Sequence, residues 1–97
     1  MKIKLCGIDY TVHFYEPGEL IDDEGNILFG QYHSGEAKIQ IGRYGRDREL
    51  ETARHEVAHA YLGEALLGWD EFTAEDVCLL IGKYGQEICD KANRIMK

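Results

Sequence analysis

The spacing of the apolar residues changes once along this chain, near Gly42, and the change limits which class of fold is possible. Before Gly42, apolar side chains recur at every second position, as at Tyr10, Val12 and Phe14, which is the period of a β-strand. From Asp47 onward they recur every three or four positions, which is the period of an amphipathic helix. Strands followed by helices, rather than alternating with them, predict an α+β fold.

The strand-forming half divides into two hairpins joined by a polar connection. The first hairpin turns at Gly7, and the second has arms over residues 27–32 and 37–41. Residues 16–26 carry the only proline and five acidic side chains, which is typical of an exposed connection. We therefore expect a three- or four-stranded antiparallel sheet, with residues 37–41 at an edge where an extended peptide could pair.

The helical half is expected to contain a central helix and two C-terminal helices. Asp47 is the predicted N-cap of the central helix, which must stop between Gly63 and Gly68 because glycine supplies the left-handed C-cap conformation. Residues 73–76 read Thr-Ala-Glu-Asp, a capping box that predicts the start of a second helix. Gly85 is then expected to separate a short third helix near the end of the chain.

The central helix carries the segment His55-Glu56-Val57-Ala58-His59. Two histidines four positions apart differ by only about 40° around a helix axis, so both imidazoles project from one face and can bind one ion. Glu56 lies about 100° from His55, where it can reach a water molecule on that ion without ligating the ion itself. The segment therefore predicts a zinc site held by His55 and His59, with Glu56 as the catalytic general base.

A catalytic zinc ion commonly has three protein ligands, so a third residue is needed. Glu64 points to the opposite side of the central helix if that helix continues, and its direction excludes it. The acidic residues that a returning second helix could bring to the metal are Glu71, Glu75 and Asp76. Because Asp76 is engaged in the predicted capping box, Glu75 is the freer carboxylate and is our choice of third ligand.

The remaining histidines and the tyrosines are weaker candidates for the site. His13 lies in a predicted strand and His33 at a predicted turn, and at such positions a solvated histidine is commoner than a metal ligand. Tyr44, Tyr61 and Tyr84 are unranked candidates for assisting the oxyanion that develops during hydrolysis.

The length and charge of the chain limit its partners. Ninety-seven residues suffice for one domain, which we expect to span residues 1–97. A net charge of -7 argues against nucleic acid, since binding a phosphate backbone needs clustered positive charge. The first residues, Met-Lys-Ile-Lys-Leu, do not show the apolar stretch of a secretory signal, and no apolar run approaches the roughly 20 residues of a bilayer crossing. We therefore expect a cytoplasmic protein with no membrane partner.

These features resemble a known family, the minimal HExxH zincins of the ImmA/IrrE-like type, which includes short versions encoded by phages and mobile elements. The resemblance covers most of the chain: Gly-Gln-Tyr at residues 30–32, Lys-Ile-Gln-Ile at 38–41, Arg-Glu-Leu-Glu-Thr before the motif, and Glu-x-Val from Glu75. It implies a zincin-like domain whose sheet packs on the metal-binding helix, with zinc bound by both helical histidines and Glu75. Arg54 departs from the family, whose members usually have an aliphatic residue before the first histidine.

The motif and the resemblance together predict a zinc-dependent metallopeptidase that hydrolyses peptide bonds in a protein or peptide substrate. The main alternative is a non-catalytic module that binds zinc and acts by occupying a host or phage protein. Another amide hydrolase, such as a deformylase, would want a cysteine ligand in a Gly-Cys-Leu setting, which Leu-Cys-Gly at Cys6 does not match. The identity of the substrate and the oligomeric state stay open.

Overall fold

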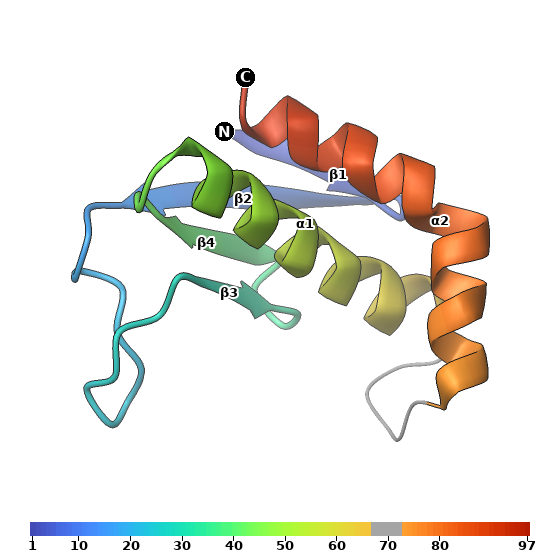
Figure 1. Cartoon of the computed structure of the whole chain (residues 1–97), viewed down its shortest axis with the longest axis horizontal. Helices are drawn as coiled ribbons and strands as arrows, with labels where there is room; N and C mark the ends of the chain where they lie inside the picture. The colour runs from blue at the N-terminus through green and yellow to red at the C-terminus, as the bar shows by residue number, and fades with distance from the viewer. Residues whose placement is uncertain (67–72) are drawn as a thin grey trace.

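A four-stranded sheet packs against two helices in the computed structural model, which describes residues 1–66 and 73–97 (Figure 1). The predicted α+β class is confirmed. In chain order the elements are β1 (Lys2–Leu5), β2 (Ile8–Tyr15), β3 (Gly30–His33), β4 (Lys38–Gly42), α1 (Arg46–Tyr61), the π-helical segment η1 (Leu62–Leu66) and α2 (Ala74–Ile95).

The sheet is mixed, so the prediction of a wholly antiparallel sheet is wrong. Its strand order is β1-β2-β4-β3, and β2 pairs in parallel with β4, where Val12 lies opposite Ile39. The two other pairings are antiparallel hairpins, as predicted. The chain leaves β2, forms β3 at a distance from it, and returns as β4 between the two (Figure 1). A period-two pattern is the same for either arrangement, because it does not specify which hairpin strand meets the neighbouring hairpin.

Residues 37–41 do not form the predicted edge. They fall almost entirely in β4, which is paired on one side with β2 and on the other with β3. The side chains of Ile39 and Ile41 are fully buried, as suits an inner strand. Among the described strands, the edges of the sheet are β1 and β3.

The hydrophobic core lies between the sheet and the two helices. The sheet and both helices contribute side chains to it: Ile3, Leu5, Tyr10, Val12, Ile39 and Ile41 from the sheet, Ala53, Val57, Ala60 and Tyr61 from α1, and Ile88, Ala92 and Ile95 from α2. Because one face of α1 is buried in this core, the opposite face is left for solvent.

The start of α1 differs from the prediction. Gly45 is the N-cap, with φ of 105°, and Asp47 lies in the first turn. Glycine adopts this positive φ without a steric penalty, which lets the chain turn from β4 into the helix. The Glu49 carboxylate accepts a hydrogen bond from the Gly45 amide at 3.0 Å and so supplies part of the missing cap. The α-helical hydrogen bonding ends at Tyr61, close to the expected end near Gly63.

The capping box predicted at Thr73 is confirmed at the start of α2. The Asp76 amide donates to Thr73 Oγ1 at 3.2 Å, and Asp76 Oδ2 accepts from the Thr73 amide at 2.9 Å. The prediction of a separate third helix is wrong, because α2 continues without a break to Ile95. Figure 1 shows α2 bending part-way along instead, and Gly82 and Gly85 lie in its middle. Neither α1 nor α2, the α-helices of the described residues, is long and apolar enough to cross a membrane.

The continuity of α2 can be tested at Gly82, because nothing lies within 4 Å of the position that a Cβ would occupy there. Alanine is more favourable than glycine inside a helix, so Gly82→Ala should raise the free energy of unfolding by about 0.5 to 1 kcal/mol. Urea denaturation followed by circular dichroism measures the change. As a control, Gly7→Ala at φ 79° should lower stability. A destabilising Gly82→Ala would contradict a helix through this position.

Candidate metal centre

The predicted histidine pair is brought together on the exposed face of α1. The Nε2 atoms of His55 and His59 lie 3.1 Å apart, and their ring centroids are 4.8 Å apart in an edge-to-face arrangement. Ligand atoms of His55, Glu56 and His59 all lie within 4.8 Å of one another. The expectation that both imidazoles project from one helix face is confirmed.

This donor set fits a small divalent ion. Two nitrogens that each bind zinc at 2.0 to 2.1 Å in a tetrahedral site are about 3.3 Å apart, close to the observed separation of 3.1 Å. Burial and the neighbouring His55 ring lower the pKa of His59, which favours the neutral imidazole that a metal requires. The geometry supports a metal site, and imidazole donors suit zinc as well as copper, nickel and iron.

Glu56 is buried beside the histidine pair, with only 6% of its surface exposed. Loss of hydration on burial raises the pKa of its carboxyl group to about 7. A group with a pKa near neutrality can both accept and return a proton, which is what a general base requires. The sequence predicted the position of Glu56 but gave no indication of its burial.

Gly30 explains how Glu56 becomes buried. A Cβ at this position would overlap Thr52 Cγ2 and would lie 3.0 Å from Glu56 Oε2. The absence of a side chain therefore allows β3 to lie directly against the motif on α1. The sequence analysis missed this role, although a glycine inside a strand pattern is a known sign of close backbone approach.

Tyr32 is a second site residue that the sequence analysis missed. Its ring stacks on the His59 imidazole, with centroids 6.2 Å apart and planes inclined by 15°. Its hydroxyl group is hydrogen-bonded to the hydroxyl of the buried Tyr10 at 2.8 Å. Tyr32 follows Gly30 by two positions in β3, so both residues face α1. The alternation of side chains along a strand could therefore have predicted from the sequence that Tyr32 lies on the same face as Gly30.

The three tyrosines named as oxyanion candidates have other contacts. Tyr61 is buried in the core and packs against Tyr84, with centroids 5.4 Å apart. Tyr44 packs against Phe29, and its hydroxyl accepts a hydrogen bond from the Gly18 amide at 2.7 Å. The structure therefore directs attention to Tyr32, which contacts the motif through His59.

Among the described residues, the third-ligand candidates Glu75 and Asp76 lie outside the group formed by His55, Glu56 and His59. Glu75 is exposed in the first turn of α2, and Asp76 is held by Thr73 in the capping box. Glu64 was excluded as a ligand because it was expected to point away from His55. It is exposed in η1 and also lies outside the group. Glu71 lies outside the described residues. The assignment of Glu75 stays a prediction.

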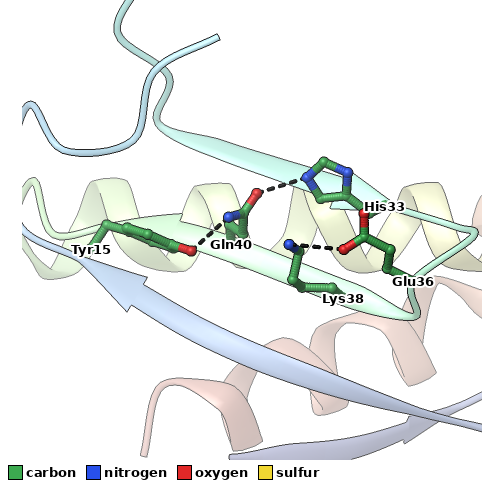
Figure 2. A network of polar contacts seen from close by, with 5 residues as sticks. All are labelled: Tyr15, His33, Glu36, Lys38 and Gln40. Atoms are coloured by element: carbon green, nitrogen blue, oxygen red, sulfur yellow. Dashed lines mark hydrogen bonds and ion pairs between the residues drawn. The ribbon is translucent and has the colours of Figure 1, made fainter. Parts of the chain in front are cut away.

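His33 takes part in a polar network on the face of the sheet that points away from α1 (Figure 2). Its Nε2 lies 2.7 Å from Gln40 Oε1, and Gln40 Nε2 donates to the Tyr15 hydroxyl at 2.7 Å. Beside it, Lys38 pairs with Glu36 at 3.1 Å. His13 is exposed on β2. His33 therefore contacts Gln40 and is not part of the group formed by His55, Glu56 and His59.

Two hollows flank the motif and share Gly30, His55 and Glu56 in their walls. One, of about 300 Å³, extends toward Tyr32. The other, of about 270 Å³, extends toward Arg48, whose guanidinium lies 4.4 Å from the centre of the Phe29 ring. The hollows follow β3 on both sides of the motif and form an open groove between β3 and α1.

Comparison of the chain with protein-family models, with curated proteins and with solved structures finds no match. The proposal of a function therefore rests on the geometry of His55, Glu56 and His59 and of the residues around them.

The close approach at Gly30 can be tested by adding and then relieving an overlap. Gly30→Ala should lower the free energy of unfolding by about 1 to 3 kcal/mol, because the new methyl group overlaps Thr52 Cγ2. Adding Thr52→Ser removes that methyl group and should restore part of the loss. Denaturation of both single variants and of the double variant measures the coupling. Strictly additive effects would contradict the contact.

The burial of Glu56 predicts how the stability of the metal-free protein depends on pH. Its pKa in the folded state is raised from 4.5 to about 7, so the unfolded state loses its proton first as the pH rises. The free energy of unfolding should therefore fall between these values, and Glu56→Gln should be more stable than the wild type by about 2 kcal/mol at pH 8.

Urea titrations in a chelator from pH 4 to 8 check this prediction. The difference between the Glu56→Gln variant and the wild type should shrink below about pH 4.5, where both states of the wild type are protonated. Glu51→Gln, an exposed change on the same helix, is the control. A difference that does not vary with pH would mean that Glu56 is hydrated in the folded state.

Proposed function

We propose that this chain is a zinc-dependent metallopeptidase that hydrolyses peptide bonds in a protein or peptide substrate. The observation that carries the proposal is the pair of imidazole nitrogens 3.1 Å apart on an exposed helix face, with the buried Glu56 carboxylate next to them. A structural zinc site is closed by four protein ligands, whereas this pair lies beside an open groove. That openness favours access by water and substrate.

The side chains divide the chemical work among them. His55 and His59 would hold the ion, with Glu75 as the predicted third ligand. When bound, zinc would acidify a water molecule and polarise the carbonyl group of the peptide bond. Glu56 would accept the proton of the attacking water and then give it to the leaving amine, a cycle suited to its pKa of about 7. Tyr32 would keep the His59 ring in its ligating orientation through stacking.

The groove beside β3 favours an extended polypeptide as the substrate. β3 lies at an edge of the sheet, so a peptide strand can pair with it as an additional strand. This role was expected for residues 37–41, and the observed strand order transfers it to β3. A peptide bound there would pass Gly30 and lie beside Glu56 and His55.

The sequence resemblance to minimal ImmA/IrrE-like zincins agrees with this proposal in the order of its parts. A hairpin with Gly30 and Tyr32 precedes a helix that carries the motif, and a further helix follows. Zinc binding without turnover, as in a module that occupies a host or phage protein, is the alternative. The same geometry would support it, so experiments on Glu56 must separate the two.

Metal binding is the first test. Purified protein should contain about one zinc ion per chain, and His59→Ala should abolish stoichiometric binding because it removes one of the paired donors. Inductively coupled plasma mass spectrometry and competition with a zinc chelator measure content and affinity. Glu75→Gln, Glu71→Gln and Asp76→Asn should be compared, with Glu51→Gln as the control. We expect Glu75→Gln alone to lower zinc affinity, by about a hundredfold or more. Full affinity in that variant would refute the Glu75 assignment and leave the histidine pair intact.

Hydrolysis is the second test and separates the enzyme from the binding module. Glu56→Gln should keep zinc but lower the rate of peptide hydrolysis by about a hundredfold or more, because the general base is lost. Cleavage of unfolded casein by the zinc-loaded protein, followed by mass spectrometry, measures this rate. A variant that retains the wild-type rate, or a zinc-loaded wild type with no hydrolysis, would count against the metallopeptidase proposal.

A further inference from the structure

A short hairpin lies between β2 and β3, and Figure 1 shows it projecting from the body of the molecule. We call residues 19–28 the arm. Its two sides meet where Ile21 pairs with Ile27 in an antiparallel bridge, which backbone hydrogen bonds of 2.9 Å flank on both sides. The two isoleucines therefore form a non-hydrogen-bonded pair, the kind in which opposite side chains lie closest together.

The tip and the base of the arm are both fixed by contacts. The Gly25 amide donates to the Asp22 carbonyl at 3.1 Å, and Gly25 has a φ of 85°, which glycine adopts without a steric penalty. The Asp22 carboxylate accepts hydrogen bonds from the amides of Glu24 at 2.9 Å and Asn26 at 2.8 Å. Leu20 is buried at the base. The arm is thus held in shape before a partner binds, which lowers the entropy cost of binding.

The isoleucine pair is exposed, whereas the neighbouring leucines are not. Leu20 is buried and Leu28 half-buried, but the exposed fractions of Ile21 and Ile27 are 52% and 59%. Side chains alternate along each side of a hairpin, so the arm directs its leucines inward and its isoleucines outward. A pair of threonines would suit the same backbone, because β-branched residues of either kind favour it. The hairpin does not require apolar side chains there, and a partner would explain them.

Charge indicates which kind of partner the arm fits. The arm carries four acidic side chains and no lysine or arginine. Asp23 and Glu24 are exposed at its tip and form no ion pair among residues 1–66 and 73–97. A second copy of the chain would bring another acidic arm and another net charge of -7, so like charges oppose the pairing of two arms. A positively charged segment would be attracted instead.

We propose that the arm binds a polypeptide segment of a partner protein in which aliphatic side chains are combined with lysine or arginine. Ile21 and Ile27 would pack against the aliphatic groups, and the carboxylates of Asp23 and Glu24 would pair with the cations. Only Phe29 separates the arm from β3, so a protein held by the arm has its adjoining chain close to the groove beside β3. The arm lies outside the candidate metal centre and adds a class of partner to the proposed function.

Binding of synthetic peptides tests both parts of this surface. The probes are three peptides of equal length that alternate lysine with leucine, lysine with serine, and glutamate with leucine. Each is titrated into the whole chain by calorimetry. The lysine–leucine peptide should bind at least about tenfold more tightly than either of the others, because only this peptide suits both the isoleucine pair and the carboxylates. Equal affinities, or tightest binding of the glutamate–leucine peptide, would overturn the inference.

A double variant tests the isoleucine pair. Ile21→Thr with Ile27→Thr removes apolar surface and keeps side chains that suit the hairpin. It should bind the lysine–leucine peptide about tenfold more weakly. Ile8→Thr is the control, because it changes a partly exposed isoleucine at the opposite end of β2 from the arm and should leave the affinity unchanged. An unchanged affinity in the double variant, or an equal loss in the control, would contradict the proposed contact.

A second double variant tests the charges. Asp23→Asn with Glu24→Gln removes two charges and leaves the turn formed by the Asp22 carboxylate in place. The affinity should fall about three- to tenfold at low salt, and the difference from the wild type should shrink at high salt. Asp9→Asn with Asp90→Asn, which removes two exposed charges elsewhere, is the control. An equal loss in this control would mean that net charge attracts the peptide and would reject the arm as its site.

Binding by the arm needs no metal, so this proposal and the metallopeptidase proposal can fail separately. Arm-dependent binding without hydrolysis of any peptide would count against the metallopeptidase and keep the arm as an interaction surface. Hydrolysis without arm-dependent binding would keep the metallopeptidase and reject the arm. Sedimentation velocity adds a check on the partner. Self-association that Ile21→Thr with Ile27→Thr abolishes would assign the arm to a second copy and overturn the proposal.

Discussion

The packing of α1 against the sheet is the interaction on which the candidate site depends. Ala53, Val57 and Ala60 are fully buried, and their spacing of three to four residues fixes which face of the helix meets the core. His55 is thereby directed to solvent and His59 to the boundary, and the two can meet above the surface. Small side chains at two of these three positions also let the helix lie close to the strands.

Two walls on either side of α1 convert this exposed face into a site. On one side, β3 approaches so closely at Gly30 that Glu56 is buried and Tyr32 stacks on His59. On the other side, α2 contributes Leu80 and the exposed Ile81. The hollows around the histidine pair therefore arise between neighbouring elements of one small fold, and His55 borders all of them.

Burial of Glu56 links its proposed role as a base to the stability of the fold. A carboxyl group whose pKa is raised to about 7 by loss of hydration makes the ionised, metal-free protein less stable than an apolar or amide substitute would. Such a cost is common where a proton must be exchanged near neutral pH, because the same desolvation tunes the base. The constraint at Gly30 maintains this environment, since any side chain there would displace Thr52 or Glu56.

The sequence by itself determined the α+β class, both hairpins, the capping box at Thr73 and the histidine pair of α1, because each depends on spacing within one local segment. It did not determine the parallel pairing of β2 with β4, the edge position of β3, or the continuity of α2 through Gly85. Those features depend on which segments meet in space, and a period-two pattern or a single glycine is compatible with more than one answer. The burial of Glu56, the stacking of Tyr32 on His59 and the hollow between Ala58 of α1 and Leu80 of α2 were decided by tertiary packing alone, since each needs a contact between elements that are distant in the chain.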